Sequence, residues 1–199
     1  YTTLFRSAYG DKVLTRATLA AMAQTLESGG RRVVGGVNGD LYVLATGVPL
    51  GVVVTGGVVR SLPGSDNFGY YAVGFRGDGT AFVGQPGLTA TVTFKGFTFP
   101  LGGGINKIRN VNTNYVLYTE DFASTTQNNE PGIDVILTPV LDELGEETAL
   151  DLDVSGGDDV PISEVKADVV QSAQPTVGGR VTYRVEQVLN STGAIPIPA

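Results

Sequence analysis

Residues 89–94 carry the sequence TATVTF, in which threonine alternates with an apolar side chain. Because successive side chains of a strand point to opposite faces, this alternation predicts a strand with one buried and one solvated face. Such strands are typical of antiparallel sheets, whereas the strands of a parallel sheet are apolar on both faces. Residues 95–101, KGFTFPL, keep part of the pattern, so we expect a half-buried antiparallel sheet in this region.

Shorter apolar runs on both sides of this stretch predict further strands joined by tight turns. Gly56-Gly57 lies between two valine pairs, and Gly77-Asp78-Gly79 separates residues 72–75 from residues 81–84. Gly-Gly and Asp-Gly favour hairpin turns because they accept positive φ. The sequence therefore predicts two hairpins, and it predicts further strands over residues 33–37, 115–118, 133–138, 167–170 and 180–189.

One segment near the N-terminus has the periodicity of a helix. Its apolar side chains recur at the i, i+3, i+4 and i+7 spacing of one helical face, at Leu19, Met22, Ala23 and Leu26. Thr15 is the expected N-cap, and Gly29-Gly30 is the expected end. We expect this apolar stripe to pack into the core. The predicted fold class is therefore α+β: mainly antiparallel sheet and β-hairpins, with one N-terminal helix packed on the sheet.

The composition excludes several kinds of chemistry. The 199 residues include no cysteine and no histidine, so disulfides, thiolate nucleophiles, a Ser-His-Asp triad and histidine zinc sites cannot be built from them. A net charge of −7 argues against a nucleic-acid partner, which requires clustered lysine and arginine. No apolar run approaches the roughly 18 residues that a membrane-spanning helix needs. Local chemistry must rest on carboxylates, amides, hydroxyls, arginine, lysine and tyrosine, and we expect no cofactor and no metal.

Residues 141–164 form an acidic stretch. Nine acidic side chains and no basic one occur between its first and last acidic residues. The simplest interpretation is a solvated insertion between strands. The alternative is a calcium loop, because residues 151–156, DLDVSG, imitate the opening of an EF-hand loop. However, the twelfth position of that loop is Ile162 in place of a bidentate glutamate, which argues against calcium.

Turn chemistry is concentrated in residues 33–61, VVGGVNGDLYVLATGVPLGVVVTGGVVRS. Asn38-Gly39-Asp40 places an amide and a carboxylate beside a glycine that accepts positive φ, and both side chains are predicted to stand at a strand end. Residues 47–51, GVPLG, predict a rigid turn because the proline fixes φ. Taken alone, Asn-Gly-Asp is common turn chemistry, and a structural role for both side chains is the plainer interpretation.

The order of these segments resembles the phosphodiester glycosidase family, which includes the lysosomal uncovering enzyme, an N-acetylglucosamine-1-phosphodiester α-N-acetylglucosaminidase, and many bacterial surface proteins. Residues 37–41 (VNGDL) and 46–51 (TGVPLG) look like two of its motifs, followed by the hairpin. Later segments also look like family segments, in family order: residues 71–82 (YAVGFRGDGTAF), 104–109 (GINKIR) and 116–126 (VLYTEDFASTT). An Arg-Thr-Ala-Ile-Gly-like strand and an Asn-Leu-Asp-Gly-Gly-Gly-Ser-like turn, both usual in the family, do not occur in this sequence.

The resemblance implies an enzyme that hydrolyses a sugar-1-phosphodiester of the N-acetylglucosamine type and releases the sugar. A phosphate ester leaves as a stable anion, so the site must mainly stabilise a sugar cation, position water and hold phosphate charge. Asp40 is the catalytic candidate, acting on the water or on the cation. The candidate substrate-binding residues are Asn38 for a sugar hydroxyl, Asn106 and Arg109 for phosphate or sugar oxygens, and Thr119, Asp121 and Thr126 as a supporting polar shell.

These residues also have plainer interpretations. Arg109 fits a surface ion pair, Asp121 fits the cap of a turn, and Thr126 fits an ordinary loop. Two other classes of protein therefore remain open: a non-catalytic carbohydrate-binding β-domain, and a structural β-domain of a bacterial surface protein. In the enzyme and in the binding domain, the expected partner is a glycan or sugar-phosphate.

We expect residues 8–199 to be the N-terminal portion of a phosphodiester glycosidase-like domain, with the acidic insertion at about residues 141–164. Residues 1–7, YTTLFRS, equal the in-frame translation of a common sequencing adapter, and we exclude them from the fold prediction; an ordinary N-terminal strand is the alternative. A secreted or cell-surface location, with possible cell-wall association through other domains, is implied by the family resemblance only.

Overall fold

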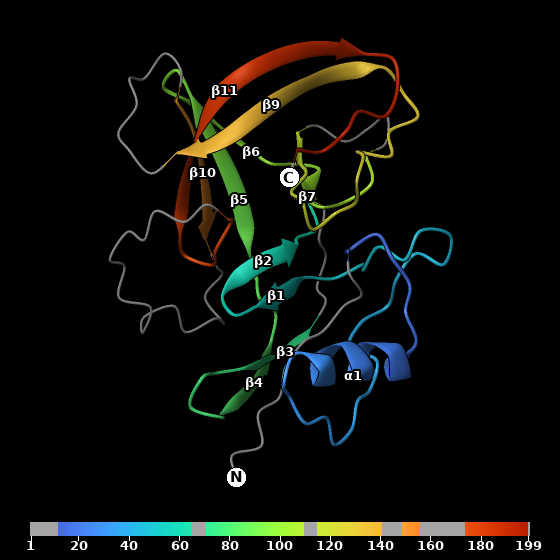
Figure 1. Cartoon of the computed structure of the whole chain (residues 1–199). Coiled ribbons are helices and arrows are strands. Elements are labelled where there is room, and N and C mark those ends of the chain that lie inside the picture. The colour runs from blue at the N-terminus through green and yellow to red at the C-terminus, as the bar shows by residue number, and fades with distance from the viewer. Residues whose placement is uncertain (1–11, 65–70, 110–114, 141–148, 156–173, 199) are drawn as a thin grey trace.

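Most of the regular secondary structure in the described residues is β-strand (Figure 1). The computed structural model describes residues 12–64, 71–109, 115–140, 149–155 and 174–198. These ranges hold eleven strands and a single helix of ten residues. The predicted α+β class is therefore wrong, and the fold is mainly β. The α+β class assumed that the helix forms a layer packed on the sheet. One short, largely exposed helix does not form such a layer.

The largest sheet has five strands in the order β6-β5-β10-β11-β9, and every neighbouring pair is antiparallel. The strands are β5 (Thr89–Phe94), β6 (Phe97–Pro100), β9 (Gly132–Val140), β10 (Ala149–Ser155) and β11 (Arg180–Ser191). The TATVTF stretch is β5, and its apolar residues Ala90 and Val92 are buried. They share a hydrophobic cluster with Leu152 of β10 and Val181 of β11. The antiparallel sheet predicted from this stretch is confirmed.

Strand β10 lies in the middle of this sheet although it falls inside the acidic stretch. It pairs with β5 on one side and with β11 on the other. Leu152 and Val154 are buried, whereas Asp153 is half-buried, and this burial raises the pKa of its carboxyl. Because successive side chains of a strand point to opposite faces, Leu152 and Val154 enter the core while Asp153 lies on the other face. Residues 149–155 are therefore no solvated insertion, and the rest of the acidic stretch lies outside the described residues.

Both predicted hairpins are present. Strands β1 (Val53–Thr55) and β2 (Val58–Ser61) are joined by the two adjacent glycines, with φ values of 61° and 83°. Strands β3 (Ala72–Phe75) and β4 (Ala81–Gly84) are joined by the Gly-Asp-Gly turn, in which Gly79 has a φ of 88°. Glycine adopts these conformations without steric cost, so the turn residues decide where both hairpins fold back.

A short parallel pair packs next to the first hairpin. Its second strand falls within the strand predicted over residues 115–118, whereas its first strand and the parallel pairing were not predicted. Strands β7 (Gly104–Ile105) and β8 (Val116–Leu117) form this pair. Leu62, directly after β2, exchanges two backbone hydrogen bonds with Ile105, at 3.0 and 2.9 Å. Val59, Leu62 and Ile105 are buried in the same hydrophobic cluster as the main sheet. One core therefore fixes the position of β7 relative to β2.

Helix α1 (Leu19–Ser28) begins three residues later than its predicted cap implies. The N-cap is Thr18, whose hydroxyl accepts a hydrogen bond from the amide of Ala21 at 3.1 Å. The hydroxyl of Thr15 donates instead to the carbonyl of Lys12, at 2.5 Å. Two threonines precede the apolar stripe, and only the geometry of the preceding loop selects the one that caps the helix. The predicted C-terminal end at Gly29 is confirmed.

The apolar stripe of α1 does not enter the core. The helix contains no fully buried residue, and Leu19 is 48% exposed. Figure 1 places α1 among the loops of the N-terminal third, away from the five-stranded sheet. The predicted packing of this stripe into the core is wrong, because helical periodicity identifies an apolar face but not what covers it.

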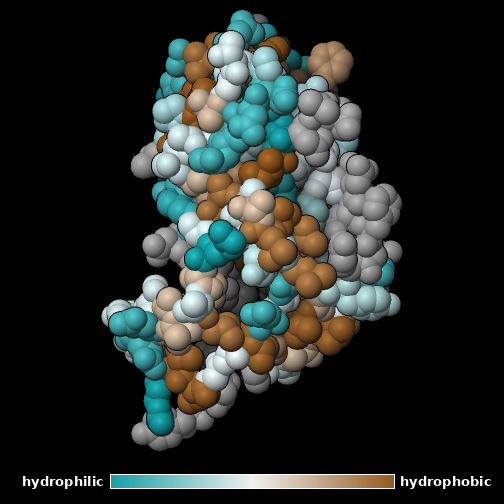
Figure 2. Space-filling view, turned by 90° about the vertical axis from the view of Figure 1, so that its right-hand side faces the viewer, coloured by the Kyte–Doolittle hydropathy of each residue, from teal (hydrophilic) through white to brown (hydrophobic). Residues whose placement is uncertain are grey.

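The surface around α1 is rich in apolar residues. Figure 2, which views the molecule from the right-hand side of Figure 1, shows hydrophobic residues gathered over the middle and lower part of this face. The exposed large apolar residues of the N-terminal third are Leu19, Val34, Val37, Leu41, Tyr42, Val43, Leu44 and Leu50.

Two of the predicted strands are not found in the described residues. Residues 33–37 form no strand, so the prediction of a strand there is wrong, and the predicted strand at residues 167–170 lies outside the described residues. Within the described ranges, no helix has the length and apolar character required to cross a membrane.

Candidate functional site

The Asn-Gly-Asp turn leads into an irregular hairpin formed by residues 41–50. Tyr42 and Pro49 form an antiparallel bridge across it. The amide of Leu50 donates to the carbonyl of Leu41 at 2.8 Å. The GVPLG segment, predicted as a rigid turn, is therefore the tip and returning arm of this hairpin. Its end comes back beside the turn from which the hairpin started.

The carboxylate of Asp40 closes the base of this hairpin. One oxygen, Oδ1, accepts from the amide of Leu41 at 2.7 Å, and Oδ2 accepts from the amide of Gly51 at 2.7 Å. A Cβ on Gly51 would lie 2.9 Å from Oδ2, so a larger residue at this position would require the carboxylate to move. Asp40 is exposed, and each of its oxygens retains acceptor capacity for water or a ligand. The backbone thus orients the carboxylate without enclosing it.

Lys107, which was not predicted as a site residue, holds the same turn from the other side. Its Nζ lies 2.5 Å from the carbonyl oxygen of Pro49, 3.4 Å from that of Leu50 and 3.0 Å from that of Gly51. Burial lowers the pKa of Lys107 to about 8, and the negative charge of Asp40 partly opposes this shift. The turn therefore lies between an ammonium and a carboxylate, and each contacts a different set of backbone groups.

An open hollow of about 620 Å³ adjoins this turn. Its lining comes from one continuous segment of the chain: Asn38, Gly39, Asp40, Leu41, Tyr42 and Leu44. Sites for small ligands commonly measure roughly 300–1,000 Å³ and combine apolar walls with a few polar groups. The predicted residues Asn38 and Asp40 therefore line one hollow, together with an aromatic ring and two leucines.

Asn106, Thr119 and Asp121 come together in a second cluster, in the interior. Asn106 is fully buried, and its Nδ2 donates to the carbonyl of Arg60 and to the hydroxyl of Thr119, both at 2.8 Å. Its Oδ1 accepts from the amide of Thr119 at 2.9 Å. The Thr119 hydroxyl also accepts from the amide of Asp121 at 3.3 Å. Asn106 therefore contacts protein groups rather than the hollow.

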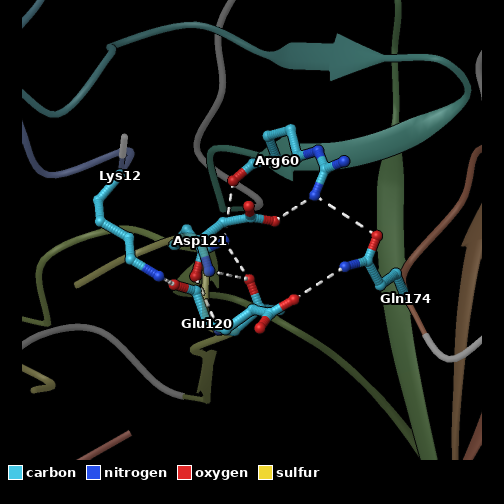
Figure 3. A network of polar contacts seen from close by, with 7 residues as sticks. Lys12, Arg60, Glu120, Asp121 and Gln174 are labelled. Atoms are coloured by element: carbon cyan, nitrogen blue, oxygen red, sulfur yellow. Dashed lines mark hydrogen bonds and ion pairs between the residues drawn. The ribbon is translucent and has the colours of Figure 1, made fainter. Parts of the chain in front are cut away.

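Figure 3 shows that this cluster continues into an ion pair between two distant parts of the chain. The guanidinium of Arg60, on β2, lies 2.6 Å from a carboxylate oxygen of Asp121, with side chains 19% and 15% exposed. The same nitrogen lies 3.4 Å from the side-chain oxygen of Gln174. Gln174 donates to Glu120 at 3.3 Å, and Lys12 donates to the carbonyl of Glu120. The network joins the N-terminal segment, β2, the loop after β8 and the segment before β11.

The remaining two predicted residues lie in other surroundings. The guanidinium of Arg109 donates to the carbonyl of Glu130, and its amide donates to the hydroxyl of Tyr118 at 3.2 Å. Burial raises the pKa of Tyr118. Thr126 is buried; its amide donates to the carbonyl of Ile195 at 2.9 Å, and its hydroxyl accepts the amide of the same residue at 3.2 Å. Thr126 therefore fastens the C-terminal segment.

The seven predicted residues divide into two groups and two separate positions. Asn38 and Asp40 line the hollow; Asn106, Thr119 and Asp121 form the interior cluster; Arg109 and Thr126 stand elsewhere. Sequence analysis missed Arg60 and Lys107. Lys107 lies inside the GINKIR segment next to Asn106, so adjacency was an available signal. Arg60 had no such signal, because its partner Asp121 is far away in the sequence.

Within the described parts of the chain, no three acidic side chains come close enough together to hold a metal ion. Comparison of the chain with protein-family models, curated proteins and solved structures gave no significant match.

Proposed function

We propose that the chain supplies part of the site of a hydrolase that acts on a sugar-1-phosphodiester of the N-acetylglucosamine type and releases the sugar. The observation that carries the proposal is the exposed carboxylate of Asp40, which two backbone amides orient beside an open hollow. The order of sequence motifs that resembles phosphodiester glycosidases supports the same reaction. A secreted or cell-surface location is part of this proposal.

In this proposal, Asp40 stabilises the positive charge that develops at the anomeric carbon, or it orients the attacking water. Both tasks need a carboxylate whose direction is set before the substrate arrives, and two backbone hydrogen bonds set it. The departing phosphate ester is already a stable anion, so no strong general acid is required. The site can therefore work with a single well-placed carboxylate and without histidine.

The other walls of the hollow suit a sugar. The amide of Asn38 can donate to and accept from sugar hydroxyls, and the ring of Tyr42 offers an apolar face. Arg109 does not line the hollow and donates to the carbonyl of Glu130, so this proposal assigns it no contact with the substrate. The interior cluster of Asn106, Thr119 and Asp121 supports the site without touching the substrate in this proposal.

The test is Asp40→Asn in the full-length natural protein, with methyl α-N-acetylglucosaminyl phosphate as substrate and release of free sugar as the readout. We expect turnover to fall by ~100-fold or more, because an oriented charge next to the reacting carbon is lost. Asp78→Asn is the matched control: Asp78 also accepts a backbone amide in an exposed turn, from Thr80 at 2.8 Å, but lies in the β3–β4 hairpin. Equal turnover in Asp40→Asn and the unmodified protein would remove Asp40 from the mechanism.

A second candidate function, a non-catalytic carbohydrate-binding β-domain, has one observation in its favour. Both oxygens of Asp40 already accept backbone amides, which is also the geometry of a purely structural turn. This alternative predicts that the sugar-1-phosphodiester binds in a calorimetric titration, that no sugar is released, and that Asp40→Asn weakens binding only slightly.

A further inference from the structure

The base of the 41–50 hairpin is held by one peptide group that two charged side chains contact from opposite ends. The carbonyl oxygen between Leu50 and Gly51 faces the ammonium of Lys107 at 3.4 Å, and the N–H of the same peptide donates to Asp40 at 2.7 Å. The neighbouring carbonyls of Pro49 and Gly51 lie closer to the ammonium, at 2.5 and 3.0 Å. Because a trans peptide directs its C=O and N–H in opposite directions, orienting one end orients the other.

We propose that Lys107 is a positioning residue for Asp40: by holding the carbonyls of residues 49–51, it directs the amide of Gly51 at the carboxylate and so fixes the carboxylate at the hollow. The inference deepens the proposed function and rests on it for its catalytic meaning. Its structural content, the coupling between Lys107 and Asp40 through one peptide, stands on the contacts alone.

The geometry argues against a direct role for Lys107 in binding phosphate. An ammonium has three N–H donors, and three carbonyl oxygens lie within 3.4 Å of Nζ. Lys107 also does not line the hollow. Its main chain is anchored from the interior, because the preceding residue, Asn106, is fully buried and makes three side-chain hydrogen bonds. Lys107 therefore holds the exposed turn in a fixed position relative to the buried Asn106 cluster.

Polarisation gives the coupling its strength. A cation at the carbonyl end of a peptide makes its N–H a stronger donor, and hydrogen bonds in such a chain reinforce one another. Removing the ammonium should therefore loosen the Gly51 amide even though it also relieves the cost of desolvating a charge. In Lys107→Met we therefore expect amide protection at Gly51 to fall, while the free energy of unfolding of the whole chain is unchanged or rises.

The experiment compares amide hydrogen exchange in the unmodified chain, Lys107→Met and the control Lys95→Met, whose side chain is exposed in the β5–β6 turn. We expect the protection factor of Gly51 to fall ~10-fold in Lys107→Met, the size expected for weakening one charge-assisted hydrogen bond, while core amides of β5 keep theirs. Unchanged protection at Gly51 would overturn the proposal. A uniform loss at all amides would overturn it as well, because it would mark a general structural role.

A second measurement uses the unmodified chain and needs no variant to fold. The ¹³C resonance of the Asp40 carboxyl should shift with a midpoint at pH of about 8, where Lys107 loses its proton, and this step should vanish in Lys107→Met. A carboxyl resonance that shows no step there would contradict the coupling. Both readouts are independent of turnover, so absent sugar release would defeat the proposed function and leave this inference standing.

Discussion

The exposed Asp40 turn and the buried Asn106 cluster are built from the same kinds of residue and do different things. In the turn, a carboxylate accepts two backbone amides and still faces solvent. In the cluster, the amide of Asn106 uses both of its functional atoms on protein partners and is inaccessible. A polar group in water exchanges partners at little cost, whereas a buried one must be satisfied internally. Burial thus distinguishes the two residues: the exposed Asp40 can contact a ligand, whereas the buried Asn106 has a structural role.

The two regions are covalent neighbours. Asn106 belongs to the interior cluster, and Lys107 reaches the exposed turn. Asn106 has a φ of 53°, a conformation that asparagine accepts more readily than most residues. Because one dipeptide serves both regions, changes in the cluster should reach the turn, while changes in the turn should leave the cluster intact.

Asn106→Ala should give the largest effect. Truncation leaves the carbonyl of Arg60 and the amide of Thr119 without buried partners, and alanine is strained at positive φ. We expect a loss of about 3 kcal/mol or more in the free energy of unfolding, measured by urea denaturation. Asn38→Ala, at the exposed turn, should change it by less than ~0.5 kcal/mol. Equal costs for the two variants would erase the distinction between cluster and turn.

Arg60→Met tests the ion pair of the cluster. It leaves the largely buried carboxylate of Asp121 without its cation, and we expect a cost of about 2 kcal/mol, reduced from that of a fully buried pair by residual solvent. Combining it with Asp121→Asn should cost less than the sum of the two single changes, because the second removes the charge that Arg60 compensates. Additive costs in this double-mutant cycle would mean that the pair contributes nothing beyond its separate side chains.

Gly51→Ala tests the turn itself. The added Cβ would lie 2.9 Å from Oδ2 of Asp40, so the carboxylate must move and its hydrogen bond to the Gly51 amide weakens. We expect about 1 kcal/mol of destabilisation together with loss of any sugar release that depends on Asp40. Gly35→Ala is the control, since a Cβ there meets nothing within 4 Å. A Gly51→Ala protein with unchanged stability and turnover would show that the close approach is unimportant.

Stability should also depend on pH through Lys107. Burial lowers the pKa of Lys107 to about 8 from the ordinary value of 10.5, so between these values the unfolded chain binds more protons than the folded one. Stability should therefore rise as pH increases from about 8 toward 10.5, with a slope below the limit of about 1.4 kcal/mol per pH unit because the two states differ by less than one bound proton. Thermal or urea unfolding of the unmodified chain and Lys107→Met over this range should diverge in that direction. Parallel curves would mean that Lys107 titrates normally in the folded state.

Local patterns predicted the strands well because the information lies within a few residues. Alternation in TATVTF identified a strand of the main sheet, and two glycine turns identified both hairpins. The helix was placed to within a turn, but its packing was not, because an apolar stripe does not specify its partner. The acidic composition of residues 149–155 concealed a central strand, because average charge outweighed the alternation of Leu152 and Val154.

The candidate site was predictable in part for the same reason. Asn38 and Asp40 belong to one local turn, so their proximity followed from the sequence. The contact of Lys107 with residues 49–51 and the pairing of Arg60 with Asp121 each join segments more than fifty residues apart. No spacing rule connects residues at that separation, and only chain folding brings them together.

The sequence alone determined the alternating strands, the glycine turns, the absence of histidine and cysteine chemistry, and the proximity of Asn38 and Asp40, because each depends on neighbours along the chain. It did not determine the geometry at Asn38 and Asp40, because no strand precedes them. Tertiary structure alone decided that the fold is mainly β, that β10 lies at the centre of the sheet, and which of the polar residues face solvent. The physical reason is burial: whether a side chain is satisfied by protein or by water depends on segments that are distant in sequence and close in space.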